Sequence, residues 1–173
     1  MYSLSEAEQI VSSALDISES DRSLLTSELK YLRRHGFPKL PKTGKGSRTN
    51  YTERDVFQLM VAVRIGQMRF PPKAAIQAAE LASEAISAAK SLQPGPFLCF
   101  MAGDPKIISA EEAHTIVEER GAATLVGLEG LVEKFKATVE RHLTDQKSQT
   151  RAPAQDFMNM VEYIWEKRDG DKR

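Results

Sequence analysis

Basic side chains gather in one stretch of this sequence, Leu29 to Thr52, and their chemistry suits a phosphate backbone. The stretch holds seven Lys or Arg residues and no Asp or Glu, although the whole chain has a formal net charge of zero. Acidic flanks balance it: residues 1–28 carry six acids and one base, and residues 74–144 carry ten acids and six bases. A local excess of positive charge attracts polyanions, because each neutralised phosphate releases a counterion. The stretch predicts a nucleic-acid interface; the alternative is a solvated charged surface.

This basic stretch divides into two halves with different expected roles. The residues up to His35 continue a predicted helix, and they are the better candidates for base contacts. The residues after Pro38 have the prolines and glycines of a loop or hairpin, so their bases and hydroxyls are expected to contact phosphates. The candidate DNA-binding residues are Lys30, Tyr31, Arg33, Arg34, His35, Lys39, Lys42, Lys45, Ser47, Arg48, Asn50 and Tyr51.

Two tyrosines of this set, Tyr31 and Tyr51, have two interpretations each. A tyrosine hydroxyl can donate a hydrogen bond to a phosphate oxygen, and the same ring can seal an apolar core. The sequence leaves both interpretations open.

Other reactive residue types are too scattered to form a site. His35, His114 and His142 are far apart and lack the helical spacing of paired metal ligands. The GKGS sequence at 44–47 lacks the full spacing of a phosphate-binding loop. Cys99 is the only cysteine and lies in an apolar run, which excludes an internal disulfide and a thiol metal site. We therefore expect no catalytic residues, no metal and no cofactor.

Helices are expected to hold the basic stretch on both sides. Apolar residues recur with helical spacing, and the expected helices cover residues 5–15, 20–35, 53–66 and 71–90. Ser5 with Glu8 resembles a capping box, and Thr52 is a plausible N-cap for the third helix. Gly36 and Gly66 are expected to end the second and third helices. One face of the second helix is expected to be apolar and to bury its side chains, with Lys30, Arg33 and Arg34 on the exposed side. The residues expected on this face are Leu24, Leu25, Glu28, Leu29 and Leu32.

The second half of the chain has a different character. Pro94, Gly95 and Pro96 mark a boundary, so we expect three regions: residues 1–92, a small α/β module over 93–145, and a linker with a last helix over 146–173. The module is expected to hold strands at 96–103 and 122–128 and helices at 108–121 and 129–143. The fold class is therefore mainly α. Apolar residues expected to cover this module in a dimer or partner complex are Phe97, Phe100, Leu125, Leu131, Phe135, Phe157, Ile164 and Trp165.

The order of helix, helix, basic loop, helix, helix is typical of a winged helix-turn-helix. Residues 5–82 resemble the DNA-binding domain of MerR-type transcription regulators, in which a helix ending in Leu-Arg-Tyr-Tyr-Glu precedes Gly-Leu and a wing closing on Arg-x-Tyr. The matching positions are Leu29, Lys30, Tyr31, Arg33, Gly36, Phe37, Pro38, Arg48, Tyr51, Thr52, Asp55, Leu59, Gly66, Phe70 and Ile76. The resemblance implies phosphate contacts by the two tyrosines and binding to double-stranded DNA.

The chain also departs from the MerR pattern. The segment between the first helix and Leu29 is longer, and Pro94 interrupts the region where the family continues into a long dimerisation helix. With one cysteine, thiol-based metal sensing is excluded. The resemblance therefore supports DNA binding more than ligand sensing.

The expected function is DNA-binding transcription regulation by a homodimer, with RNA polymerase or another regulator as a further partner. A single winged domain buries too little surface for tight operator binding, whereas two domains double the contacts. Two alternatives stay open: an interaction module at residues 97–165 that the first domain tethers to DNA, and a phage-type excision or packaging accessory protein. No apolar run is long enough to cross a bilayer and no signal pattern begins the chain, so we expect a cytoplasmic, nucleoid-associated location without membrane contact.

Overall fold

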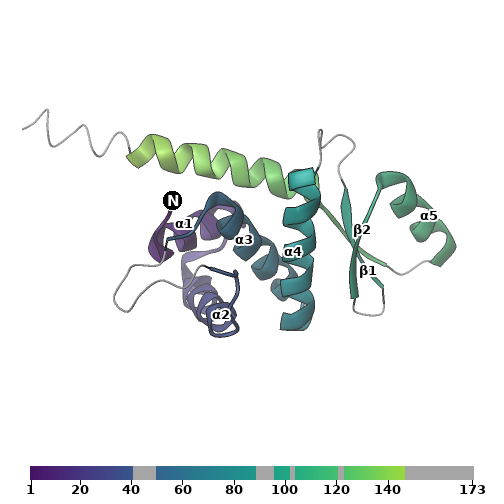
Figure 1. The fold of residues 1–173 in the computed structure, drawn as a ribbon, viewed down its shortest axis with the longest axis horizontal. Helices are drawn as coiled ribbons and strands as arrows, with labels where there is room; N and C mark the ends of the chain where they lie inside the picture. The colour runs from purple at the N-terminus through teal and green to yellow at the C-terminus, as the bar shows by residue number, and fades with distance from the viewer. Residues whose placement is uncertain (41–49, 89–95, 102–103, 121–122, 147–173) are drawn as a thin grey trace, which may run out of the picture. The chain divides into compact units, whose positions relative to one another are not determined.

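The computed structural model describes residues 1–40, 50–88, 96–101, 104–120 and 123–146 (Figure 1). Two compact units divide the chain, Met1–Thr138 and Val139–Arg173. The elements are α1 (Leu4–Ala14), a 3-10 turn (Glu19–Asp21), α2 (Arg22–Arg34), α3 (Glu53–Gln67), α4 (Pro72–Ala88), β1 (Phe97–Met101), β2 (Asp104–Ile108), α5 (Ala110–Arg120) and β3 (Thr124–Gly127). Residues 128–146 are also helical. The expectation of a mainly α fold with a small sheet is thus confirmed.

Helix α1 starts earlier than predicted. Ser3 caps it: the Ser3 hydroxyl accepts a hydrogen bond from the Glu6 N–H at 3.3 Å, and the Glu6 carboxylate accepts one from the Ser3 N–H at 2.6 Å. The box predicted at Ser5 is wrong, because the extended chain ends at Tyr2, which forms an isolated bridge with Tyr51. The apolar face is as expected, and its buried residues are Ala7, Ile10, Val11 and Ala14.

Helix α2 buries a single apolar row. Leu25, Leu29 and Leu32 are buried, as their spacing predicts. Leu24 was expected on this face, and that expectation is wrong because its side chain is 68% exposed. Leu24 lies about 100° around the helix from Leu25, which turns it out of the core.

Helix α3 lies at the centre of the helical part. Thr52 caps it as predicted: its hydroxyl accepts from the Asp55 N–H at 3.2 Å, and Asp55 accepts from the Thr52 N–H at 2.8 Å. Gly66 does not end the helix, which runs to Gln67, and the chain turns at Arg69 with a φ of 64°. Small side chains let α4 approach α3 closely; the buried alanines are Ala74, Ala75, Ala78, Ala79 and Ala82.

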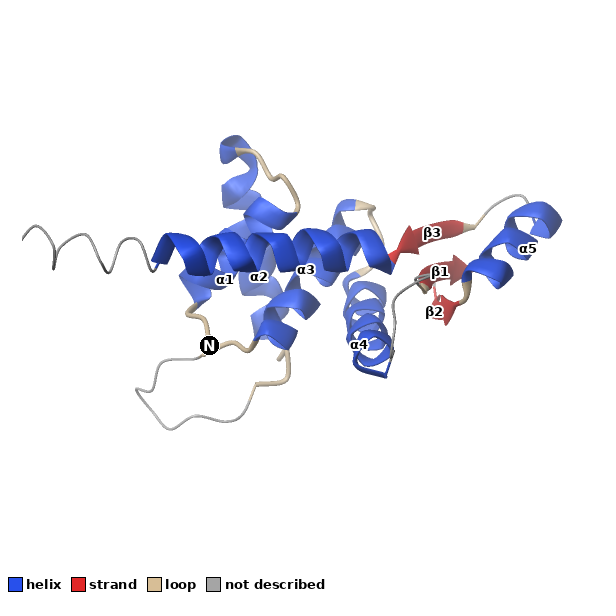
Figure 2. Ribbon diagram, turned by 90° about the horizontal axis from the view of Figure 1, so that it is seen from above, coloured by secondary structure: helices blue, strands red, loops and turns tan. Residues whose placement is uncertain are grey.

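The sheet has three antiparallel strands in the order β2-β1-β3, one more than predicted (Figure 2). The unpredicted strand is β2, which contains Pro105 opposite Phe100 of β1. Proline removes a backbone donor and argues against a strand, but the edge position of β2 tolerates it. Helix α5 covers one face, where the cluster of Cys99, Ile108 and Ala113 is buried.

The helix over residues 128–146 follows β3 directly. Within the first unit its apolar side chains are buried, and Phe135 packs edge-on against Phe57 of α3 with ring centroids 5.4 Å apart. A second aromatic contact joins Phe70, just before α4, to Phe100 of β1 at 4.1 Å. The contact between Phe70 and Phe100 therefore joins the sheet to the helical part within the first unit.

Candidate nucleic-acid interface

The last turns of α2 present basic side chains to solvent. Lys30, Arg33 and Arg34 are exposed, because the buried row of Leu25, Leu29 and Leu32 occupies the other side of the helix. No acid in the described part of the chain pairs with these three bases. This half of the basic stretch is therefore free to meet an anionic partner.

The outer face of α2 continues toward its N-terminus as a row of four exposed residues. Ser23, Ser27, Lys30 and Arg34 follow the i, i+4, i+7, i+11 spacing, which places them along one line of the helix. The Ser27 hydroxyl donates to the Ser23 carbonyl at 2.9 Å. The sequence analysis missed Ser23 and Ser27, although the spacing from Lys30 would have found them.

Tyr31 and His35 lie on the flank of this row. Their rings are 4.4 Å apart and tilted by 50°, and Tyr31 is 42% exposed. The Tyr31 hydroxyl is therefore not sealed in the core, so the interpretation as a phosphate donor stays possible for Tyr31.

The end of α2 sets the path of the chain into the loop half. Gly36 adopts a φ of 71°, as expected for a glycine after a helix. The Gly36 N–H donates to the Arg33 carbonyl at 2.9 Å and the Phe37 N–H to the Leu32 carbonyl at 3.0 Å, the pattern of a Schellman motif. Phe37 is buried, and the Phe37–Pro38 peptide is cis. A packed aromatic ring thus fixes the point where the loop leaves α2.

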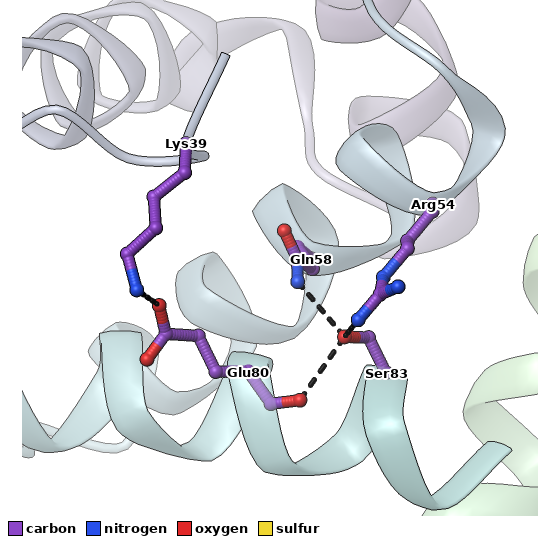
Figure 3. Close-up of polar contacts among 5 residues, drawn as sticks. All are labelled: Lys39, Arg54, Gln58, Glu80 and Ser83. Atoms are coloured by element: carbon purple, nitrogen blue, oxygen red, sulfur yellow. Dashed lines mark hydrogen bonds and ion pairs between the residues drawn. The ribbon is translucent and has the colours of Figure 1, made fainter. Parts of the chain in front are cut away.

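Lys39 connects the beginning of the loop to α4. Its Nζ lies 2.8 Å from the Glu80 Oε1, and this hydrogen bond raises the pKa of Lys39 (Figure 3). An exposed ion pair of this kind contributes little to stability. Its consequence is that Lys39, unlike Lys30 or Arg34, already has an anionic partner within the chain.

Glu80 also belongs to a polar cluster between α3 and α4. The Ser83 hydroxyl donates to the Glu80 carbonyl at 3.0 Å and accepts from the Gln58 Nε2 at 2.8 Å and from the Arg54 Nη2 at 3.4 Å (Figure 3). Gln58 and Ser83 are buried. The sequence carried no signal of this cluster, because its members come from two helices with no common spacing.

The remaining loop residues divide between the described and undescribed parts of the chain. Asn50 is exposed. Tyr51 is fully buried, and its backbone pairs with that of Tyr2 through two hydrogen bonds of 2.8 Å. Four predicted phosphate ligands lie outside the described residues: Lys42, Lys45, Ser47 and Arg48.

Tyr51 fits the core-sealing interpretation and not the phosphate contact. Its hydroxyl is buried without a hydrogen-bond partner in the described chain. Burial raises its pKa, against a lowering by the nearby Arg33 and a further rise from Asp55. A hydroxyl removed from solvent in this way cannot reach a phosphate without movement of the surrounding chain, so the structure corrects this assignment.

Several residues predicted to cover a partner are buried within the chain itself. Phe100 stacks on Phe70, and Phe135 packs on Phe57. Leu131 is also buried, while Phe97 and Leu125 are half-buried against the α5 cluster. Intramolecular packing already removes Phe100, Leu131 and Phe135 from water within the described chain, and their role in a dimer or partner interface stays a prediction. The other three predicted interface residues, Phe157, Ile164 and Trp165, lie outside the described residues.

The rest of the described chain offers little other chemistry. Cys99 is buried, and His114 pairs with Glu118 on the surface of α5 at 3.2 Å. No group of three potential metal ligands occurs among the residues that the structure places. Within those same ranges, no helix combines the length and the apolarity that crossing a membrane requires.

Comparison of the chain with protein-family models and with curated proteins finds no match.

Proposed function

We propose that this protein is a transcription regulator that binds double-stranded DNA, with α2 contacting base edges and residues 39–48 contacting phosphates. The observation that carries the proposal is the exposed basic end of α2, continuous in sequence with residues 39–48, which hold four more bases and no acid. An α-helix fits the major groove, where Lys and Arg side chains hydrogen-bond guanine edges. Lys30 and Arg34, on the outer row of α2, are the residues proposed for this contact.

The element order supports the same proposal. Helices α1 and α2 precede the basic loop, and α3 begins immediately after it at a capped Thr52. Residues 5–82 resemble MerR-type domains, and this resemblance predicts the same order of helices around a basic wing. We propose the winged helix-turn-helix as the interpretation of this arrangement, and a homodimer as the form that contacts two half-sites.

A selection experiment with two groups of variants tests the proposal. The variant Lys30→Ala/Arg34→Ala removes proposed base contacts, and the variant Lys42→Ala/Lys45→Ala/Arg48→Ala removes proposed phosphate contacts. Random duplexes retained by each variant would be sequenced and their affinities measured. We expect the first variant to select a different sequence and the second to weaken binding to all sequences alike.

A matched control separates specific contacts from net charge. Lys106, Lys136 and Arg141 are exposed bases outside the basic stretch. Replacing all three by Ala changes the charge as much as the loop variant does, and we expect it to leave DNA affinity within about twofold, because these three bases are not among the proposed contacts and salt screens their general attraction. Equal losses in the control and the loop variant would contradict the proposal.

A further inference from the structure

A pocket of about 620 Å³ lies beside the turn between α1 and α2. Its walls come from the turn, from the first half of α2 and from the end of α3. This volume is in the range of small-molecule sites. The lining residues that carry the argument are Leu24, Leu25, Glu28, Val63 and Gly66.

Glu28 is the unusual residue of this pocket. Its carboxylate is half-buried, and no hydrogen bond or ion pair reaches it from the described residues. It packs so closely on α3 that a Cβ at Gly66 would collide with it. The atom that such a Cβ would meet is the Glu28 Oε1, at the end of a flexible side chain, so the carboxylate would have to shift.

The charged residues that line the pocket are all acids. Asp16, Asp21 and Glu28 line it, and no Lys or Arg is among the lining residues. Two of the three acids have partners: Lys134 reaches Asp16 at 3.0 Å, and the Ser18 hydroxyl donates to Asp21 at 2.7 Å. Glu28 is the acid that has none. Burial raises the pKa of Glu28, because the charged carboxylate loses contact with water and no nearby cation compensates for that loss.

Apolar side chains stand next to this carboxylate. Leu25 and Val63 are buried, and Leu24 is 68% exposed although it lines the pocket. A ligand that covered Leu24 would remove apolar surface from water. The pocket thus places the carboxylate of Glu28, which has no partner in the described chain, next to the apolar side chains of Leu24, Leu25 and Val63.

We propose that this pocket binds a small organic cation, a primary ammonium group on an apolar body. The ammonium group would donate hydrogen bonds to the Glu28 carboxylate, and the apolar body would lie against Leu24 and Leu25. Charge-assisted hydrogen bonds are the stronger class, and a partly desolvated carboxylate gains more from a cation than an exposed one. The proposal does not rest on DNA binding, since no residue of the loop half lines the pocket.

Titration of the full chain with 2-phenylethylamine, followed by amide NMR, tests the site. We expect a dissociation constant on the order of 1 mM, with shifts concentrated at Leu25, Gly66 and Gln67. Two compounds of similar shape provide the comparison: neutral 2-phenylethanol and anionic phenylacetate, which we expect to bind about tenfold more weakly or not at all. Equal binding of the three compounds, or amine shifts elsewhere in the chain, would overturn the proposal.

Two matched variants complete the test. Glu28→Gln keeps the shape of the side chain and removes its charge, so the amine should lose about tenfold or more in affinity while 2-phenylethanol is unaffected. Glu111→Gln removes an exposed acid of α5 and should bind the amine as the unmodified protein does. Unchanged amine affinity in Glu28→Gln, or equal losses in both variants, would overturn the role of Glu28. The amide spectrum reports in the same experiment that each variant is folded.

Discussion

Tyr51 and Glu28 are polar side chains that folding takes from water without supplying a partner in the described chain. An unsatisfied buried hydroxyl costs about 1–3 kcal/mol, whereas its removal leaves the surrounding packing intact. Both residues are therefore places where a small chemical change has an interpretable result.

Replacing Tyr51 by Phe removes only the buried hydroxyl. We expect Tyr51→Phe to raise the free energy of unfolding by about 1 kcal/mol, because the desolvation cost of an unpaired group disappears. Thermal denaturation measures this, and DNA affinity should stay unchanged. A loss of affinity at unchanged stability would instead show that the hydroxyl reaches a phosphate.

Glu28 gives stability a dependence on pH. Its pKa is raised in the folded state, so folding favours the protonated form. The protein therefore loses stability as the pH rises from the ordinary value of about 4.3 through the raised value. We expect Glu28→Gln to raise the melting temperature by about 1–3 °C near pH 7.

The comparison across pH supplies the control for this prediction. Below the ordinary pKa of glutamate, Glu28 is protonated in both folded and unfolded chains, so the advantage of Glu28→Gln should vanish. An equal advantage at both pH values would attribute the effect to side-chain packing and contradict the electrostatic explanation.

At the scale of elements, the contact between α3 and α4 depends on small side chains and one polar cluster. Alanines bring the two helices together, and the Ser83 hydroxyl satisfies the buried amide of Gln58. Such a cluster fixes the register of one helix against the other because each donor has a specific acceptor.

Removal of the Ser83 hydroxyl tests this description. We expect Ser83→Ala to lower the free energy of unfolding by about 1–2 kcal/mol, since Gln58 is left unsatisfied while alanine slightly favours the helix. Ser87→Ala is the matched control: its hydroxyl bonds the Ser83 carbonyl and its side chain is exposed, so the change should stay within about 0.5 kcal/mol. Urea denaturation compares the two, and equal effects would refute the role of the cluster.

Several elements could be predicted from local signals alone. The capped Thr52, the left-handed Gly36 and the apolar row of α2 each depend on residues close in sequence. Strand β2 could not be predicted, since Pro105 is permitted only by an edge position that the assembled sheet defines. Leu24 was misplaced for a related reason: a run of two leucines fits a helix face in either phase, and packing chooses between them.

The candidate site shows the same division. Exposure of Lys30, Arg33 and Arg34 follows from the helix period, so it could be predicted. The ion pair of Lys39 with Glu80 and the burial of Tyr51 depend on residues that meet only in the folded chain. Tertiary contacts therefore decide which members of a charged stretch stay free for a partner.

At the scale of the whole molecule, the internal contacts of Phe135 bear on the proposed dimer. We expect Phe135→Ala to lower the free energy of unfolding by about 3–5 kcal/mol, because a large buried ring leaves a cavity beside Phe57. Leu143→Ala, at a side chain that is 40% exposed, should cost less than about 1 kcal/mol. Light scattering on the folded proteins should find the same dimer for both variants and for the unmodified chain. Conversion of Phe135→Ala to a monomer at unchanged stability would instead place Phe135 in the interface.

The charge of the molecule is what the proposed function depends on most. Of the seven bases in the stretch, Lys39 pairs with Glu80, and Lys30 and Arg34 are the residues proposed for base edges. The four bases left for phosphates are Arg33, Lys42, Lys45 and Arg48. Each neutralised phosphate adds about −0.9 to the slope of log affinity against log salt. Four contacts therefore predict a slope of about −4.

The affinity of the full-length protein for a short duplex, measured by fluorescence anisotropy at about 50 and about 200 mM salt, tests this directly. We predict a loss of about two decades of affinity over that range. A change of less than about tenfold, or no binding at the lower salt, would contradict the proposal that residues 30–48 bind DNA through its phosphate backbone.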